Sequence, residues 1–419
     1  MSLRIAISRT MTMSAVAAIS GIAQLVLAKE VGPEQFGFYV FGTTLVTLSL
    51  AAAMLFGIPA VTIRMFVIAK DPVKRKHLCD WILKSSLKSS LVVSLMLAVI
   101  AYFTYETYGT SPVIAALMMA VIARSFCIGG ILTATGRADV AARTTMIAPA
   151  AALVLTLILI MLGILPGTGT NIMIGWAFGQ IVALIMCQNA LKKYFSRLPN
   201  VRKETPSKLI SQWRGSAVEV VIASVLLSSM AGLDVVLIGI FVQSTDVIGN
   251  YGMAIRITAI ASIAVYSIKA AYLPALAEGA AEGGRIWRKN LFKTRMYSTV
   301  ASGTCLVAAV LFLPTVMENF VPRFSDAYWP TIILLSGLLI ESITGPLNGI
   351  LQAQGREKTV VITNGSTLVF FLAAASLLIP TYGMIGAASC VAISKALYSS
   401  ALMRIHLKHQ PNRHEKERP

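Results

Sequence analysis

The chain consists largely of apolar runs long enough to cross a lipid bilayer, separated by short polar segments. About 20 apolar residues in a helix cross the hydrocarbon core, and a spanning segment must pair all of its backbone polar groups internally. The runs therefore predict an all-α polytopic membrane protein. Composition agrees, because only 13% of the residues are charged, whereas soluble proteins carry about 25%.

We place twelve predicted spans, six in each half of the chain. Residues 1–28 also have the basic start and apolar run of a signal peptide, but the run is long for a signal and the internal repeat described next requires six helices per half. The approximate limits of the spans are residues 10–28, 36–58, 85–104, 112–132, 144–165, 169–190, 215–240, 247–270, 296–314, 328–350, 359–380 and 383–403.

An octapeptide occurs twice, as Gly130–Arg137 and Gly349–Arg356, with six of its eight positions identical. Two further groups of matches occur in the same order: Gly37 and Tyr39 with Gly249 and Tyr251, and Ile58–Ala60 with Leu273–Ala275. Matches in a constant order predict a duplicated unit. The predicted domains are an N-terminal six-helix lobe at 1–190, a basic cytoplasmic linker at 191–214, a C-terminal six-helix lobe at 215–403 and a cytoplasmic tail at 404–419.

The distribution of Lys and Arg predicts the orientation. With twelve spans, 30 of the 36 basic residues fall on the side of the termini, two fall on the other side (Lys29 and Arg323), and four lie within spans. Cytoplasmic loops carry the excess of Lys and Arg. We therefore predict a multi-pass membrane protein with both termini in the cytoplasm.

Several function classes are excluded by the sequence. The net charge of +18 would suit a nucleic-acid-binding protein, but the basic residues lie in short clusters between apolar runs, so we expect no nucleic-acid partner. The sequence has no Walker-type phosphate loop and hence no built-in ATPase. The five cysteines are scattered and the four histidines lie in basic segments, so we predict no metal site and no cofactor.

Charged residues within the spans are the candidate functional residues, because burying a charge in hydrocarbon is costly. They include Arg124, Arg256, Asp234 and Glu341, with Arg64 at the cytoplasmic end of the second span. Guanidinium groups offer forked donors to phosphate and stay charged when desolvated, so we predict the three arginines as substrate-binding residues. We predict that Asp234 and Glu341 orient those arginines or take part in ion coupling.

The pairing of these charges stays open at the level of sequence. Arg124 and Glu341 lie at nearly equal depth on spans related by the repeat, so either they pair with each other or both line a wet cavity between the lobes. Asp234 and Arg256 lie on consecutive spans and could neutralise each other. Lys269, on the same span as Arg256, and Lys395, on the last span, have long stems that can snorkel to the interface, while Glu219 suits the start of a helix.

Three segments resemble a known family. Residues 31–39, Val-Gly-Pro-Glu-Gln-Phe-Gly-Phe-Tyr, resemble a signature of bacterial polysaccharide biosynthesis proteins, and Asp234–Phe241 followed by Val247–Tyr251 resembles that family's seventh and eighth spans. The two octapeptides resemble the ends of its fourth and tenth spans. The resemblance covers nearly the whole chain, through motifs that are individually weak but ordered as in the family.

The resemblance implies a repeat-unit flippase of the multidrug/oligosaccharidyl-lipid/polysaccharide exporter (MOP) superfamily, located in the bacterial inner membrane, with two lobes around a cationic cavity. Its substrate would be an undecaprenyl-pyrophosphate-linked oligosaccharide for O-antigen, capsule or exopolysaccharide, and a polysaccharide polymerase or export complex is the expected protein partner. Asp234 matches a position where the family carries Asp, and Arg64 matches a basic residue after the Gly-x-Pro of the second span.

Other functions remain open. The first alternative is a cation-coupled drug antiporter of the same superfamily, although four basic residues against three acidic ones within the spans favour an anionic substrate. A membrane enzyme would need a long outer segment with clustered catalytic groups, and the longest one here runs only from about Thr315 to Ala327. We therefore expect a transporter rather than an enzyme. A purely structural subunit would leave the charge of Arg124 without a role.

Overall fold

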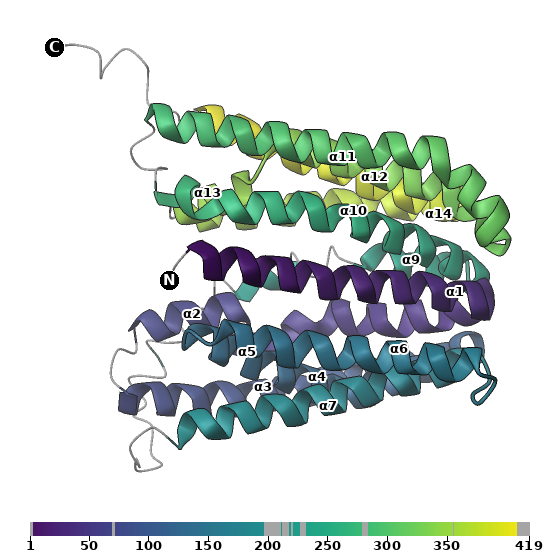
Figure 1. The fold of residues 1–419 in the computed structure, drawn as a ribbon, viewed down its shortest axis with the longest axis horizontal. Helices are drawn as coiled ribbons and strands as arrows, with labels where there is room; N and C mark the ends of the chain where they lie inside the picture. The colour runs from purple at the N-terminus through teal and green to yellow at the C-terminus, as the bar shows by residue number, and fades with distance from the viewer. Residues whose placement is uncertain are drawn as a thin grey trace.

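The structure, a computed structural model, describes residues 3–68, 72–196, 221–226, 232–278, 284–354 and 356–408, together with residues 211 and 218. Every regular element in these ranges is helical, and the helices run roughly along the long axis of the molecule (Figure 1). The predicted linker at 191–214 and the predicted tail at 404–419 fall largely outside the described residues, and so do Glu219 and parts of the span predicted at 215–240.

The first half of the chain comprises α1 to α7. The elements are α1 (Leu3–Met54), η1 (Leu55–Gly57), α2 (Pro59–Ile68), α3 (Pro72–Tyr108), α4 (Ser111–Ala134), α5 (Ala138–Ala142), the π-helical η2 (Arg143–Ile147), α6 (Ala148–Met161) and α7 (Gly169–Phe195).

The second half continues the all-helical pattern. Its described elements are α9 (Leu233–Phe241), α10 (Thr245–Glu278), α11 (Arg285–Phe320), η3 (Pro322–Ala327), α12 (Tyr328–Thr344), α13 (Leu347–Ala353) and α14 (Glu357–Lys408).

Nine helical stretches in the described part of the chain are long and apolar enough to cross a bilayer. Two long elements, α1 and α14, are each two helices joined at a glycine. Gly32 has a φ of 81° and Gly383 a φ of 55°, and glycine adopts such left-handed conformations at little cost. The apolar runs located these helices but not their ends, because α3 and α11 continue beyond the predicted limits of 85–104 and 296–314 into polar, basic turns.

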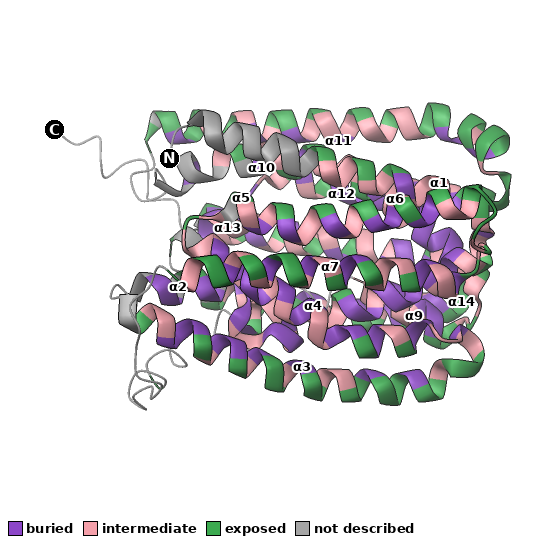
Figure 2. Ribbon diagram, turned by 60° about the horizontal axis from the view of Figure 1, so that its bottom comes forward, coloured by how far each residue is buried: buried purple, intermediate pink, exposed green. Residues whose placement is uncertain are grey.

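Large apolar side chains are exposed on the periphery of the bundle. Examples are Leu95, Phe103, Leu311 and Phe312, each more than half exposed, and Figure 2 shows exposed residues along the outer helices α3 and α11. A soluble monomer seldom exposes such a continuous apolar surface, whereas lipid tails are as apolar as these side chains. The surface is therefore that of a membrane protein.

The outer segment predicted at Thr315–Ala327 is not an irregular loop, because most of its residues are helical in α11 and η3.

Both copies of the octapeptide end a helix in the same way. The amide of Arg137 donates to the carbonyl of Leu132 at 2.8 Å, and the amide of Arg356 donates to that of Leu351 at 3.0 Å. In the first copy Gly136 has a φ of 83°, so this bond is the six-to-one hydrogen bond of a Schellman cap. The matched residues thus make matched bonds, which supports an internal duplication.

The two halves meet where α1 packs against α10, and α1 also contacts α9 and η3. Within this contact, at the start of α10, a Cβ on Gly37 would overlap the carbonyl of Thr245, and a Cβ on Gly249 would overlap the carbonyl of Pro33. Gly37 and Gly249 are matched in the repeat, so each glycine meets the start of the other's helix. The reciprocity is that of an isologous interface, in which related surfaces contact each other.

Candidate functional site

The larger cavity, about 720 Å³ in volume, lies mainly among the helices of the second half. Its walls come from α9, α10, α12 and α14, and α1 contributes Val40, Thr43, Thr44 and Thr47. Among the described residues, five charged side chains line it: Asp234, Arg256, Lys269, Glu341 and Lys395. Three cations against two carboxylates give the lining a formal charge of +1. We call this space cavity A.

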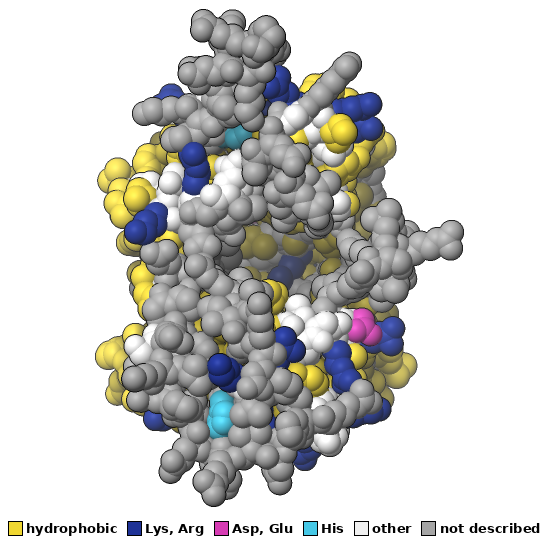
Figure 3. Space-filling view, turned by 90° about the vertical axis from the view of Figure 1, so that its left-hand side faces the viewer, with side chains coloured by type: hydrophobic (Ala, Val, Ile, Leu, Met, Phe, Trp, Pro, Cys, Tyr) yellow, Lys and Arg dark blue, Asp and Glu magenta, His cyan; other side chains and the backbone are white. Residues whose placement is uncertain are grey.

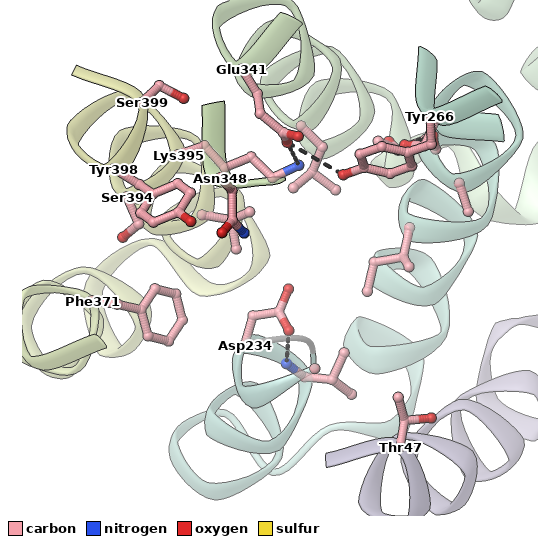
Figure 4. A pocket seen from close by; sticks show the side chains of 18 of the residues that line it. Thr47, Asp234, Tyr266, Glu341, Asn348, Phe371, Ser394, Lys395, Tyr398 and Ser399 are labelled. Atoms are coloured by element: carbon pink, nitrogen blue, oxygen red, sulfur yellow. Dashed lines mark hydrogen bonds and ion pairs between the residues drawn. The ribbon is translucent and has the colours of Figure 1, made fainter. Parts of the chain in front are cut away.

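One cluster in cavity A is centred on Glu341 of α12 (Figure 4). Its Oε1 is 3.0 Å from the Nζ of Lys269, and its Oε2 is 3.2 Å from the Nζ of Lys395. Tyr266 also donates its hydroxyl to Oε2 at 3.4 Å. The side chains of Lys269, Glu341 and Lys395 are 10%, 20% and 30% exposed. One carboxylate is therefore shared by two ammonium groups, which leaves one positive charge in excess.

Asp234 forms a separate group near the start of α9. Its Oδ2 accepts a hydrogen bond of 2.6 Å from the hydroxyl of Tyr251, and its Oδ1 accepts one of 3.0 Å from the amide of Val235. Both Asp234 and Tyr251 are buried. A carboxylate in the first turn of a helix also interacts favourably with the helix dipole. In the described residues Asp234 is thus held by Tyr251 and the helix start, not by Arg256.

Arg256 of α10 carries a cation without a carboxylate partner among the described residues. Its Nε atom is buried and makes no hydrogen bond within them. A buried donor without a partner is costly, and such a group in a native fold is a candidate ligand-binding group. Arg256 lines a second cavity in addition to cavity A.

The second cavity, cavity B, has a volume of about 350 Å³ and lies between the two halves. Its walls come from the first part of α1, from η2 and α6, from α7, and from the Arg256–Ile263 stretch of α10. Both volumes fall within or near the roughly 300–1,000 Å³ typical of ligand pockets.

Polar side chains of α14 form a further wall of cavity A. The buried oxygens without a hydrogen-bond partner in the described residues include Asn364 Oδ1, Ser394 Oγ, Tyr398 Oη and Ser399 Oγ. Other hydroxyls on this helix behave differently, since Thr363 and Thr367 each donate to the carbonyl one turn back at 2.8 Å. Ser394 and Tyr398 are four residues apart, which places them on one face of the helix. That spacing was a signal in the sequence that our prediction missed.

The predicted site residues are only partly brought together. Arg256, Asp234 and Glu341 all line cavity A, whereas Arg124 lies half-buried in α4 and lines neither cavity. The possible pair of Arg124 with Glu341 is wrong, because Glu341 binds Lys269 and Lys395 instead. The same bonds show that these lysines do not snorkel. Arg64 lies in α2, and its side chain is outside the described part of the structure.

The end of the molecule at which α2 and α13 lie is hollowed at its centre. Figure 3 shows Lys or Arg atoms inside the hollow and basic side chains around its rim, with few acidic ones. Arg323, which the charge count places on the side of the membrane away from the termini, lies at the opposite end of the molecule, where its guanidinium faces Gly32.

Within the described residues no group of three or more His, Cys, Asp or Glu side chains is arranged to hold a metal ion.

Residues 3–280 match the sequence family described as polysaccharide biosynthesis protein. Comparison with curated protein sequences gives no match.

Similar solved structures cover nearly the whole chain. A multidrug resistance MATE family transporter of the MOP superfamily, in an inward-facing conformation, has 14% sequence identity and a TM-score of 0.70, over 96% of this chain and 98% of that chain. The lipid II flippase MurJ, in an inward closed conformation, has 14% identity and a TM-score of 0.68, over 97% and 88%. A MOP superfamily transporter from Pyrococcus furiosus has 14% identity and a TM-score of 0.62, over 96% and 95%. The predicted fold of this superfamily is therefore confirmed.

Proposed function

The chain belongs to the polysaccharide biosynthesis protein family, and we propose that it translocates a polyprenyl-pyrophosphate-linked oligosaccharide across the bacterial inner membrane. The observation that carries this proposal is the cationic cavity A, whose wall includes Arg256, a cation without a carboxylate partner among the described residues. Family membership also agrees with a transporter rather than an enzyme.

The substrate has two parts with different solvent preferences. The pyrophosphate and sugars are hydrophilic, so they need a polar path through the bilayer, whereas the polyprenyl chain is stable in lipid. Arg256 is the proposed ligand of the pyrophosphate, because its fork of donors suits phosphate oxygens. The surplus charge at Lys269 and Lys395 favours anionic over cationic cargo in the same space.

We further propose twelve spans in two six-helix lobes. The nine candidate helices support this count. The stretches in α1 and α14 each contain two helices, and α9 lies in the predicted span 215–240, which is not among the nine found in the described residues. Rocking of the lobes about the Gly37–Gly249 contact would alternate access to the cavities. The hollowed, basic end in Figure 3 is the proposed cytoplasmic side, with both termini there.

Arg64 and Arg124 remain proposed substrate-binding residues from the sequence alone. Asp234 and Glu341 are proposed to order the site or couple it to an ion, and a polysaccharide polymerase or export complex is the proposed partner. The alternative is a cation-coupled drug antiporter, which the structural likeness to a MATE transporter favours. The positive formal charge of cavity A opposes it, because a cationic drug would be repelled there.

The experiment uses purified full-length protein in liposomes that carry a prenyl-pyrophosphate-linked oligosaccharide. A membrane-impermeant glycosidase added outside measures how fast inner-leaflet substrate becomes accessible. We expect wild-type protein to expose it and Arg256→Ala to lose at least tenfold in rate. If the protein exposes the substrate no faster than protein-free liposomes do, and if it also exports a cationic dye, the antiporter replaces the flippase as the proposed function.

A further inference from the structure

Cavity B is the strongest feature that the proposed function leaves without a role. It is bounded by helices of both halves, so it lies on the path between them rather than within one bundle. Close packing surrounds it, because Gly21 of α1 approaches Ile260 of α10, and Gly179 of α7 approaches the backbone of Pro149 in α6. Close contacts at small residues thus hold the helices together beside the cavity.

Arg256 connects cavity B to cavity A. It is the single charged residue among the described residues that line cavity B, whereas cavity A has five charged residues. A pyrophosphate bound at Arg256 would therefore have a strongly charged space on one side and a nearly neutral one on the other. The group attached to that pyrophosphate can enter either space.

The polar groups of cavity B are neutral hydrogen-bonding side chains. They include the amides of Gln24 and Gln180, the indole of Trp176 and the phenol of Tyr39. The Oε1 atom of Gln24 is buried and has no hydrogen-bond partner in the described part of the chain, while its Nε2 donates to Ser20 at 3.4 Å. Gln180 is 7% exposed. An amide offers two donors and an acceptor, so these two glutamines can bind hydroxyl groups, which both donate and accept.

The remaining walls are apolar, with Ala259, Ile260 and Leu153 among them. A mixed lining of apolar surface and a few fixed hydrogen-bonding groups is typical of small-molecule sites. An aromatic ring and apolar side chains suit the C–H faces of a pyranose, and the amides suit its hydroxyls. Among the described residues of this lining no carboxylate is present to pair with an amino sugar, and the one cation, Arg256, is the proposed ligand of the pyrophosphate, so a neutral sugar fits the remaining space best.

We propose that cavity B is a binding subsite for a neutral sugar residue next to the pyrophosphate, with Gln24 and Gln180 as its hydrogen-bonding groups. This inference rests on the proposed function, and it adds a recognition step: the protein distinguishes the sugar-bearing lipid from the bare lipid pyrophosphate. The bare carrier would bind at Arg256 alone and leave the buried Oε1 atom of Gln24 unsatisfied. A site built to bind a hydroxyl rejects an analogue that lacks it.

The test measures binding of two probes to the full-length protein in nanodiscs, farnesyl pyrophosphate and farnesyl pyrophosphoryl glucose, by equilibrium dialysis. We expect the wild type to bind the glucose-bearing probe at least about tenfold more tightly, as two added hydrogen bonds would give. The Gln24→Leu/Gln180→Leu variant should reduce that ratio to about one and leave the affinity for farnesyl pyrophosphate unchanged. Retained binding of farnesyl pyrophosphate also shows that the variant is folded.

Two variants serve as comparisons. Gln354→Leu changes an exposed glutamine directly after α13 that lines neither cavity, and it should keep the wild-type ratio. Arg256→Leu should weaken both probes by a similar factor. If the double variant keeps the wild-type ratio, or weakens both probes equally, cavity B is not a sugar subsite, although the flippase proposal survives. If the wild type binds neither probe, both proposals fail.

Discussion

Replacing Glu341 by Gln removes the one carboxylate that two lysines share. Lys269 and Lys395 lie 3.0 and 3.2 Å from its oxygens, and Gln can accept a hydrogen bond from only one of them through a neutral oxygen. The variant therefore keeps the volume of the side chain but leaves two ammonium groups close together without a counter-charge. We expect a marked loss of stability.

The magnitude follows from the degree of burial. Removing one partner of a buried ion pair costs about 3–5 kcal/mol. Here the three side chains are 10–30% exposed at the wall of a cavity, so water offsets part of the loss. We expect the free energy of unfolding to fall by about 3 kcal/mol, at the lower end of that range.

The assay is equilibrium unfolding of the purified protein in mixed micelles, followed by circular dichroism. Glu318→Gln, an exposed carboxylate of α11, is the matched control and should change the stability by less than about 0.5 kcal/mol. The Glu341→Gln/Lys269→Met/Lys395→Met variant should recover most of the loss, because replacing a whole buried ion pair by apolar groups is often neutral. A Glu341→Gln protein as stable as the wild type, or a triple variant no more stable than Glu341→Gln, would refute the reasoning.

Three further predictions concern the contact between the halves and the proposed phosphate ligand. Gly249→Leu places a side chain against the carbonyl of Pro33 and should lower the free energy of unfolding by at least about 2 kcal/mol. Gly303→Ala, whose added Cβ has its nearest neighbour at 3.9 Å, should have little effect, and equal stability of the two variants would contradict the close contact. Tyr108→Phe loses the 2.8 Å hydrogen bond to the carbonyl of Gly239 but keeps the ring stacked 3.9 Å from Phe41, so thermal unfolding should report a loss of about 1 kcal/mol; no loss would show that this bond contributes nothing. Arg256→Lys should restore part of the translocation that Arg256→Ala loses, since Lys keeps the charge without the fork of donors; in the liposome assay, a Lys variant as fast as the wild type would exclude bidentate binding.

The sequence was sufficient for the class of fold because hydrocarbon leaves few options. Long apolar runs must be helices, and the matched octapeptides pointed to two related halves whose caps now prove alike at Arg137 and Arg356. The limits of the helices were harder to predict. An apolar run marks the part of a helix that lies in lipid, whereas α3 begins at Pro72, well before the predicted limit, and continues through basic turns outside the run.

The sequence predicted how deep the site residues lie in the membrane, but not the direction in which their side chains point. Asp234, Arg256 and Glu341 were selected as charges within spans, and all three line cavity A. Arg124 was selected by the same argument, yet α4 packs among α1, α3 and α7, and Arg124 lines neither cavity. Depth along a helix follows from residue number, but the direction of a side chain depends on which helices pack around it. The ion pairs of Glu341 depend on the packing of α10, α12 and α14, which a single sequence does not specify.

The central claim is tested most directly by the leaflet in which lipid-linked saccharide accumulates when the protein is absent. Spheroplasts and inverted vesicles from a deletion strain of the producing bacterium would be treated with an impermeant glycosidase. The account predicts that the saccharide is cleaved only in inverted vesicles, where the cytoplasmic leaflet faces outward, and that wild-type protein, but not Arg256→Ala, restores cleavage in spheroplasts. Saccharide that reaches the outer leaflet equally well without the protein would contradict the account.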